Sequence, residues 1–149
     1  MSRRAWRLSK RIARRAKALD QHTAAEQIHE IRIDAKKLRY LVDAVSAFYR
    51  PAEIRCILAA LKKLQRALGD FNDAYVQESR LVECGRSIGA AGGHSGALLT
   101  LGRLAERCRQ RRGQLREEVT EQLSRFRASE VQKACKRAFA SADPAPGLR

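Results

Sequence analysis

The sequence predicts an all-α protein, an antiparallel four-helix bundle of long amphipathic helices with a short extra helix near the C-terminus. Helix-forming residues dominate the 149 positions, whereas proline occurs 3 times and aromatic residues make up 5%. Hydrophobic residues, 44% of the total, recur at intervals of three and four over long stretches. Short links between these stretches favour antiparallel neighbours in a bundle.

The first predicted helix occupies residues 2–20, with a stripe of apolar residues along one side. A second helix is expected after Thr23 and runs to about Tyr49. Thr23 and Glu26 have the spacing of a capping box, in which each side chain bonds a backbone N–H at the helix start. The apolar stripe of this helix alternates steps of three and four: Ile28, Ile31, Ala35, Leu38, Val42 and Val45.

Pro51 is favourable in the first turn of a third helix, which continues to about Ile88. Gly69 is a candidate for a bend within it. The glycine-rich segment 89–96 is the predicted loop. A fourth helix follows, with its apolar stripe between Ala97 and Phe126, and a short fifth helix is expected at roughly 129–141. Residues 1–140 therefore form one helical-bundle domain, and 141–149 are predicted to be a disordered tail.

The formal net charge is +15, from 31 Lys and Arg against 16 Asp and Glu. Such an excess attracts anionic partners. Arginine outnumbers lysine, and its planar fork matches phosphate oxygens, which favours a phosphate-rich partner over a charge kept only for solubility. The four cysteines are widely spaced, as expected for reduced thiols in the cytoplasm. Without a signal peptide or a long apolar run, the sequence predicts a cytoplasmic protein with no membrane partner.

Charged residues are segregated on the predicted helices. On the second helix one flank is acidic, and the other carries His29, Arg32, Lys36, Arg39 and Tyr40. On the third helix one flank carries Arg55, Lys62, Arg66 and Arg80, with Gly69 and Asp73 between them. The first helix has a continuous cationic line that includes Arg7, Lys10 and Arg14. On the fourth, Arg112 and Arg116 lie close to the apolar sector, where a long side chain can also simply cover apolar surface.

Two of these segments resemble the conserved histidine α-helical domain (CHAD) family. They read His29-Glu-Ile-Arg-Ile-Asp-Ala-Lys-Lys-Leu-Arg-Tyr40 and Leu61-Lys-Lys-Leu-Gln-Arg-Ala-Leu-Gly-Asp-Phe-Asn-Asp73. The resemblance implies a helical bundle that binds inorganic polyphosphate on a basic surface without catalysis. It assigns to the site His29, Arg32, Lys36, Arg39, Tyr40, Lys62 and Arg66. From the charge pattern alone we add Arg7, Lys10, Arg14, Arg112 and Arg116.

The family's usual domain contains two bundles, each with its own histidine helix, whereas this sequence has one. Either two copies pair as a homodimer, or a single bundle binds with less reach. Other functions are also open: an RNA- or DNA-binding helical module, or a scaffold or adaptor on polyphosphate granules. Few aromatic residues are available to stack on bases, which weighs against nucleic acid. No arrangement of residues predicts a catalytic centre, a metal site or a cofactor.

Overall fold

The computed structural model describes residues 2–20 and 22–140, and within these ranges it contains helices and no strand. The elements are α1 (Ser2–Lys17), α2 (Ala25–Val45), a 3-10 turn η1 (Ser46–Phe48), α3 (Pro51–Ala90), α4 (Ser95–Arg127) and α5 (Ser129–Phe139). The predicted all-α class is confirmed. The predicted disordered tail, 141–149, lies outside the described residues. No described helix is long and apolar enough to cross a membrane.

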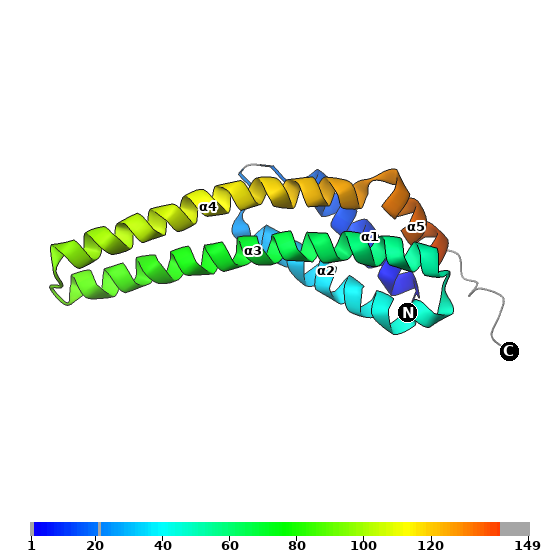
Figure 1. The fold of residues 1–149 in the computed structure, drawn as a ribbon, viewed down its shortest axis with the longest axis horizontal. Helices are drawn as coiled ribbons and strands as arrows, with labels where there is room; N and C mark the ends of the chain where they lie inside the picture. Colours follow the sequence, from blue (N-terminus) through cyan, green and yellow to red (C-terminus); the bar gives the residue numbers. More distant parts are fainter. Residues whose placement is uncertain (1, 21, 141–149) are drawn as a thin grey trace.

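The two longest helices, α3 and α4, form an antiparallel hairpin that runs the length of the molecule (Figure 1). Helices α1 and α2 pack against one half of this hairpin, with α1 touching α2 and α4, and α2 touching α1 and α3. Helix α5 closes that end by contacting α1, α3 and α4. The other half of the hairpin extends beyond these helices (Figure 1). The five described α-helices therefore pack together only in one half of the structure, which we call the bundle half.

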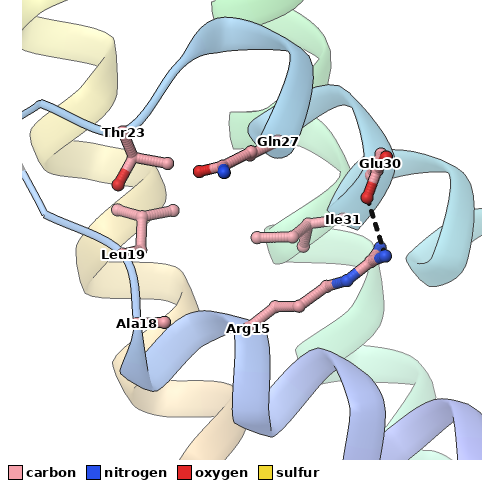
Figure 2. Close-up of a pocket in the computed structure, with 7 residues that line it drawn as sticks. All are labelled: Arg15, Ala18, Leu19, Thr23, Gln27, Glu30 and Ile31. Carbon is pink, nitrogen blue, oxygen red and sulfur yellow. Dashed lines mark ion pairs between the residues drawn. The ribbon is translucent and has the colours of Figure 1, made fainter.

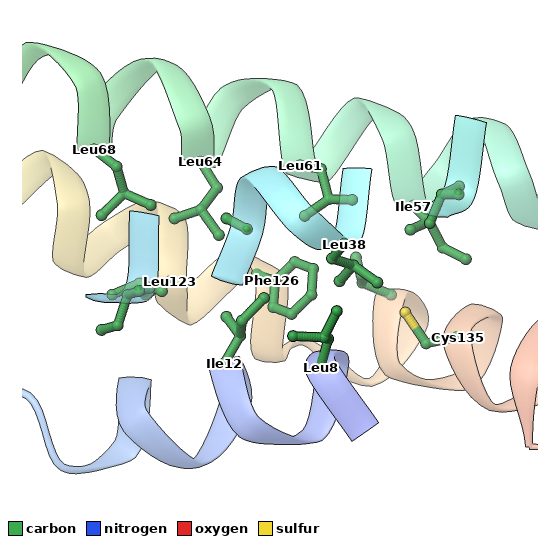
Figure 3. Close-up of a cluster of buried hydrophobic side chains, with 14 of the residues drawn as sticks. Leu8, Ile12, Leu38, Ile57, Leu61, Leu64, Leu68, Leu123, Phe126 and Cys135 are labelled. Atoms are coloured by element: carbon green, nitrogen blue, oxygen red, sulfur yellow. The ribbon is translucent and has the colours of Figure 1, made fainter. Parts of the chain in front are cut away.

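A continuous hydrophobic core fills the bundle half. Side chains from α1, α2, α3, α4 and α5 converge there, among them Leu8, Leu38, Leu61, Phe126 and Cys135 (Figure 3). The last buried residue of α3 is Ala74, and the first of α4 is Leu115. We call the part beyond them, residues 75–114, the outer arm. Its apolar side chains are exposed or half-buried, because beyond the contact of Tyr75 with α2 the two helices pack mainly against each other.

Two predicted helix boundaries are wrong. No capping box forms at the start of α2, where Ala24 is the N-cap and makes no side-chain bond. The Thr23 hydroxyl instead accepts a hydrogen bond from the Asp20 backbone N–H at 2.8 Å and donates one to the Asp20 carboxylate at 2.9 Å. This local turn competes with the cap for the same side chain. Helix α2 also ends at Val45, before a 3-10 turn, and does not reach Tyr49.

The turn between α3 and α4 is shorter than the predicted loop. Gly92 has a φ of 72°, in the left-handed region that favours glycine. The N–H of Gly93 then donates to the carbonyl oxygen of Ile88 at 2.9 Å. A Cβ on Gly93 would lie 2.2 Å from the Ile88 side chain, so this position also requires glycine. The sequence also named Gly69 as a candidate for a bend in the third helix. In the structure, α3 continues through Gly69 without interruption.

Candidate functional site

A groove of ≈ 250 Å³ lies between α2 and α3. We call it the α2–α3 groove. Its lining residues are Arg32, Lys36, Arg39, Tyr40, Gln65 and Gly69. Four of these are residues that the sequence assigned to a binding site, and they all come from the cationic flank of α2. The groove therefore has a cationic wall on α2 and an uncharged wall on α3.

The antiparallel crossing of α2 and α3 explains why these residues meet. Tyr75 donates a hydrogen bond to Glu26 at 3.1 Å, and His29 Nδ1 lies 3.1 Å from Asn72 Oδ1. Further along, the Gln65 amide donates to the backbone carbonyl of Ala35 at 3.1 Å. As residue numbers rise on α2 they fall on α3, so the flank that begins at His29 stays against α3.

Gln65 also orients Arg39. Its Oε1 accepts a hydrogen bond from Arg39 Nη1 at 3.0 Å, while its amide nitrogen is held by α2. Arg39 has a second, longer contact, 3.6 Å from its Nε to Asp43. Among the described residues, Arg32 and Lys36 have no carboxylate within ion-pair distance. Two cations in the groove are thus left with charge that no described side chain compensates.

Lys62 and Arg66 are exposed on α3 and do not line the groove itself. Helical spacing puts Lys62 one turn before Gln65 and Arg66 one turn before Gly69. They therefore extend the positive surface along the α3 rim. Gly69 contributes empty space, since a Cβ built there would find no atom within 4 Å.

His29 sits at the end of this surface and is exposed. An amide oxygen can only accept a hydrogen bond, so His29 Nδ1 is the donor in the contact with Asn72, and Nε2 has no hydrogen-bond partner among residues 2–20 and 22–140. Tyr40 is 61% exposed, and the Lys36 ammonium lies 6.0 Å from the centre of its ring. The motif residues therefore form one strip from His29 to Tyr40.

The acidic flank of α2 is compensated by α1. Asp34 is buried and accepts hydrogen bonds from Arg11 Nε at 2.7 Å and from Arg15 Nη1 at 2.9 Å. Arg15 also pairs with Glu30 at 2.7 Å (Figure 2). The hydrogen bond and the charge of Asp34 raise the pKa of Arg11. Because these carboxylates are matched by α1, they do not offset the cations on the opposite flank of α2.

The sequence interpretation missed these pairings, although a signal existed. Arg11 and Arg15 are four residues apart, as are Glu30 and Asp34. Residues with that spacing share a helix face, so two such pairs of opposite charge can meet when the helices pack. The apolar neighbours of Asp34 further indicated that it would need a partner on burial.

Arg112 and Arg116 are not brought to the α2–α3 groove. Arg112 Nε lies 2.9 Å from Glu78 Oε2, and its guanidinium packs over the Tyr75 ring. Arg116 Nη1 donates to the Thr23 carbonyl oxygen at 2.7 Å, and burial lowers the pKa of Arg116. Both guanidiniums hold α4 to its neighbours.

The cationic line of α1 is also separate from the α2–α3 groove, which no α1 residue lines. Arg7 and Arg14 are exposed, and Arg7 Nε contacts the Arg3 carbonyl oxygen at 3.4 Å. Lys10 lines a second groove, formed with α4 and α5. The sequence-predicted residues therefore divide into a strip on α2 and α3, an exposed line on α1, and two structural arginines on α4. Among the described residues, no cluster of side chains could hold a metal ion.

The chain is similar to a known protein family. A family model described as the CHAD domain matches residues 1–82. The matched residues include all of α1 and α2, and every residue that lines the α2–α3 groove. No curated protein and no solved structure matches.

Proposed function

The chain belongs to the CHAD-domain family, and from that premise we propose that it is a non-catalytic module that binds inorganic polyphosphate along the α2–α3 groove. The observation that carries the proposal is the convergence of Arg32, Lys36 and Arg39 on one groove. The family assignment supports the same ligand.

The chemistry of the groove suits a chain of phosphates. Arginine forms bidentate, charge-assisted hydrogen bonds with phosphate oxygens, and lysine supplies a compact positive charge. A phosphate polymer repeats the same anionic unit, so it needs a row of cations and little shape recognition. The strip from His29 to Tyr40, with Lys62 and Arg66 on the other rim, is such a row. Since the ligand would displace counterions, its affinity should fall with rising salt.

Nucleic acid is the main competing ligand, because it carries the same phosphate chemistry. A module for single strands usually adds aromatic side chains on which bases stack. Among the residues that line the groove, Tyr40 is the only aromatic one. Phosphate contacts without a stacking platform favour the inorganic polymer.

A competition experiment tests this choice. Labelled long-chain polyphosphate is titrated with the protein at two salt concentrations, with tRNA and DNA as competitors matched in phosphate concentration. We expect polyphosphate to bind more tightly and to lose affinity at the higher salt. Displacement by tRNA or DNA at equal phosphate concentration would favour the nucleic-acid function. Release of orthophosphate during incubation would contradict a non-catalytic role.

A double variant tests the residues. Arg32→Ala with Lys36→Ala removes two charged partners that are each worth about 1.5–3 kcal/mol when fully used. We expect polyphosphate affinity to fall at least roughly tenfold, since tenfold corresponds to about 1.4 kcal/mol. The matched control is Arg103→Ala with Arg107→Ala, an equal loss of charge on the outer arm. Equal losses in both variants would indicate attraction by net charge alone, without a site.

Two copies that pair would present two such grooves to one polymer chain. Sedimentation of the protein alone, and then with polyphosphate in excess, measures whether pairing precedes binding. If the protein sediments as a monomer both alone and with polyphosphate bound, the single bundle is the binding unit.

A further inference from the structure

A second groove, of ≈ 400 Å³, lies on the opposite side of α1 from its ion pairs with α2. We call it the α1–α5 groove. Its charged, polar and aromatic lining comes from three helices: Trp6 and Lys10 on α1, Arg127 at the end of α4, and Ser129, Gln132, Lys133 and Lys136 on α5. No carboxylate lines it. Most of these residues lie beyond the part of the chain that the family model matches.

The cations of this groove are uncompensated within the described part of the chain. None of Lys10, Arg127, Lys133 and Lys136 has a carboxylate within ion-pair distance there. Two carboxylates on or beside α5, Glu53 and Glu130, do not line the groove. Glu53 of α3 pairs with Arg137 at 3.5 Å, and the charge of Glu130 acts on Cys56. Helical spacing makes Glu130 a neighbour of Lys133 on α5, three residues on, but the two side chains form no ion pair and Glu130 does not line the groove.

The groove is also built on a fixed corner of the backbone. The Gln132 amide donates to the Phe126 carbonyl oxygen at 2.9 Å, which ties the first turn of α5 to the end of α4. Phe126 is fully buried, and Arg127 follows it directly. On the facing helix, the Lys10 ammonium lies 5.2 Å from the centre of the Trp6 ring, within cation–π range. Gln132 on the α5 wall is therefore held by the backbone of a buried residue, and Lys10 on the α1 wall by an aromatic ring.

From these observations we propose that the α1–α5 groove is a second anion site that binds a short run of phosphates, such as a triphosphate. Four cations around one groove exceed the charge of a single phosphate, so they suit a run of a few phosphates. A triphosphate could be free or part of a nucleotide. The shared chemistry is the phosphate chain, and the proposal does not depend on polyphosphate binding in the α2–α3 groove.

Trp6 makes the groove directly observable, because the chain contains 1 tryptophan. Inorganic tripolyphosphate, ATP and orthophosphate are titrated at constant ionic strength while Trp6 fluorescence is recorded. Calorimetry in parallel counts the sites. We expect a saturable response to tripolyphosphate, and at least roughly tenfold weaker binding of orthophosphate. A tighter response to ATP would identify a nucleotide as the source, and an equal or weaker one a free phosphate chain.

Variants assign the response to the groove. Lys133→Gln with Lys136→Gln should weaken the Trp6 response to tripolyphosphate at least tenfold. Two controls should leave it unchanged: Arg32→Ala with Lys36→Ala in the other groove, and Arg103→Gln with Arg107→Gln on the outer arm. Circular dichroism checks that each variant is folded. A response that does not saturate, together with no calorimetric site, overturns the proposal. So does a response lost equally in the controls.

Discussion

Filling the α2–α3 groove at Gly69 should separate binding from stability. A Cβ at Gly69 meets no atom within 4 Å, and the position lies in the interior of α3. Replacing a helical glycine by a good helix former stabilises by up to about 1 kcal/mol. We therefore expect Gly69→Ala to raise the free energy of unfolding by about 0.5–1 kcal/mol, and the melting temperature by about 2–4 °C per kcal/mol.

Gly69→Leu should keep part of this stabilisation but occupy the groove. Its side chain would project into the space between Arg32 and the α3 wall, where we place a phosphate. If one Arg32–phosphate contact is lost, at about 1.5–3 kcal/mol, polyphosphate affinity falls by roughly ten- to hundredfold. The assays are thermal unfolding, followed by circular dichroism, and titration with labelled polyphosphate.

The matched control is Gly113→Leu on α4, where a Cβ also meets no atom within 4 Å. This variant should gain stability and bind as the unchanged protein does. A Gly69→Leu protein that is folded and binds polyphosphate with full affinity would refute the reasoning, because it would show that the groove is not where the ligand lies.

Three further predictions concern the groups that support the site. Asp34→Ala should lower the free energy of unfolding by about 1.5–3 kcal/mol in urea titration, the range for a hydrogen bond to a charged group, because Arg11 and Arg15 are partly exposed and water can solvate them once the carboxylate is gone; an unchanged midpoint would contradict a structural role. Arg112→Ala should destabilise the fold but leave polyphosphate affinity unchanged, whereas reduced affinity in the folded variant would return this residue to the site. Burial raises the pKa of the Cys135 thiol to about 11 from 9.0. Its contribution to stability is complete below pH 9.0 and is lost as the pH rises toward 11. Between these two pH values, the free energy of unfolding of the unchanged protein should therefore fall more steeply with pH than that of Cys135→Ala. Equal slopes for the two proteins would exclude the effect.

Much of the fold could be predicted because it depends on local periodicity. The apolar stripe of α2 named from its spacing, from Ile28 to Val45, is buried in the structure. The end of α2 and the role of Thr23 could not be predicted, because each depends on a competition between alternatives of similar energy. Thr23 can cap a helix or close a turn with Asp20, and both use the same hydroxyl.

In the candidate site, too, some features follow from local helical spacing and others depend on tertiary packing. The α2 residues share a flank by helical spacing, so their convergence required only that this flank meet α3. Which arginines pair with carboxylates depends on tertiary packing. Arg15 and Arg116 are both arginines near the apolar side of a predicted helix. In the structure, Arg15 forms an ion pair with Glu30, whereas Arg116 donates a hydrogen bond to the backbone carbonyl of Thr23. The spacing of Arg11 and Arg15 against Glu30 and Asp34 held a signal for Arg15, but charge pattern alone could not distinguish Arg116 from Arg32.

Because the outer arm contributes no buried side chain, the length of the α3–α4 hairpin does not depend on the packing of the core. Residues 75–90 of α3 extend about 24 Å at 1.5 Å per residue and contribute no buried side chain. Removing about seven residues, or two turns, from the outer arm of each helix would keep the same faces of α3 and α4 in contact and leave every buried side chain of the core in place. Paired insertions or deletions of two turns in the outer arm would therefore change the distance from the bundle half to the tip of the hairpin without removing a buried side chain.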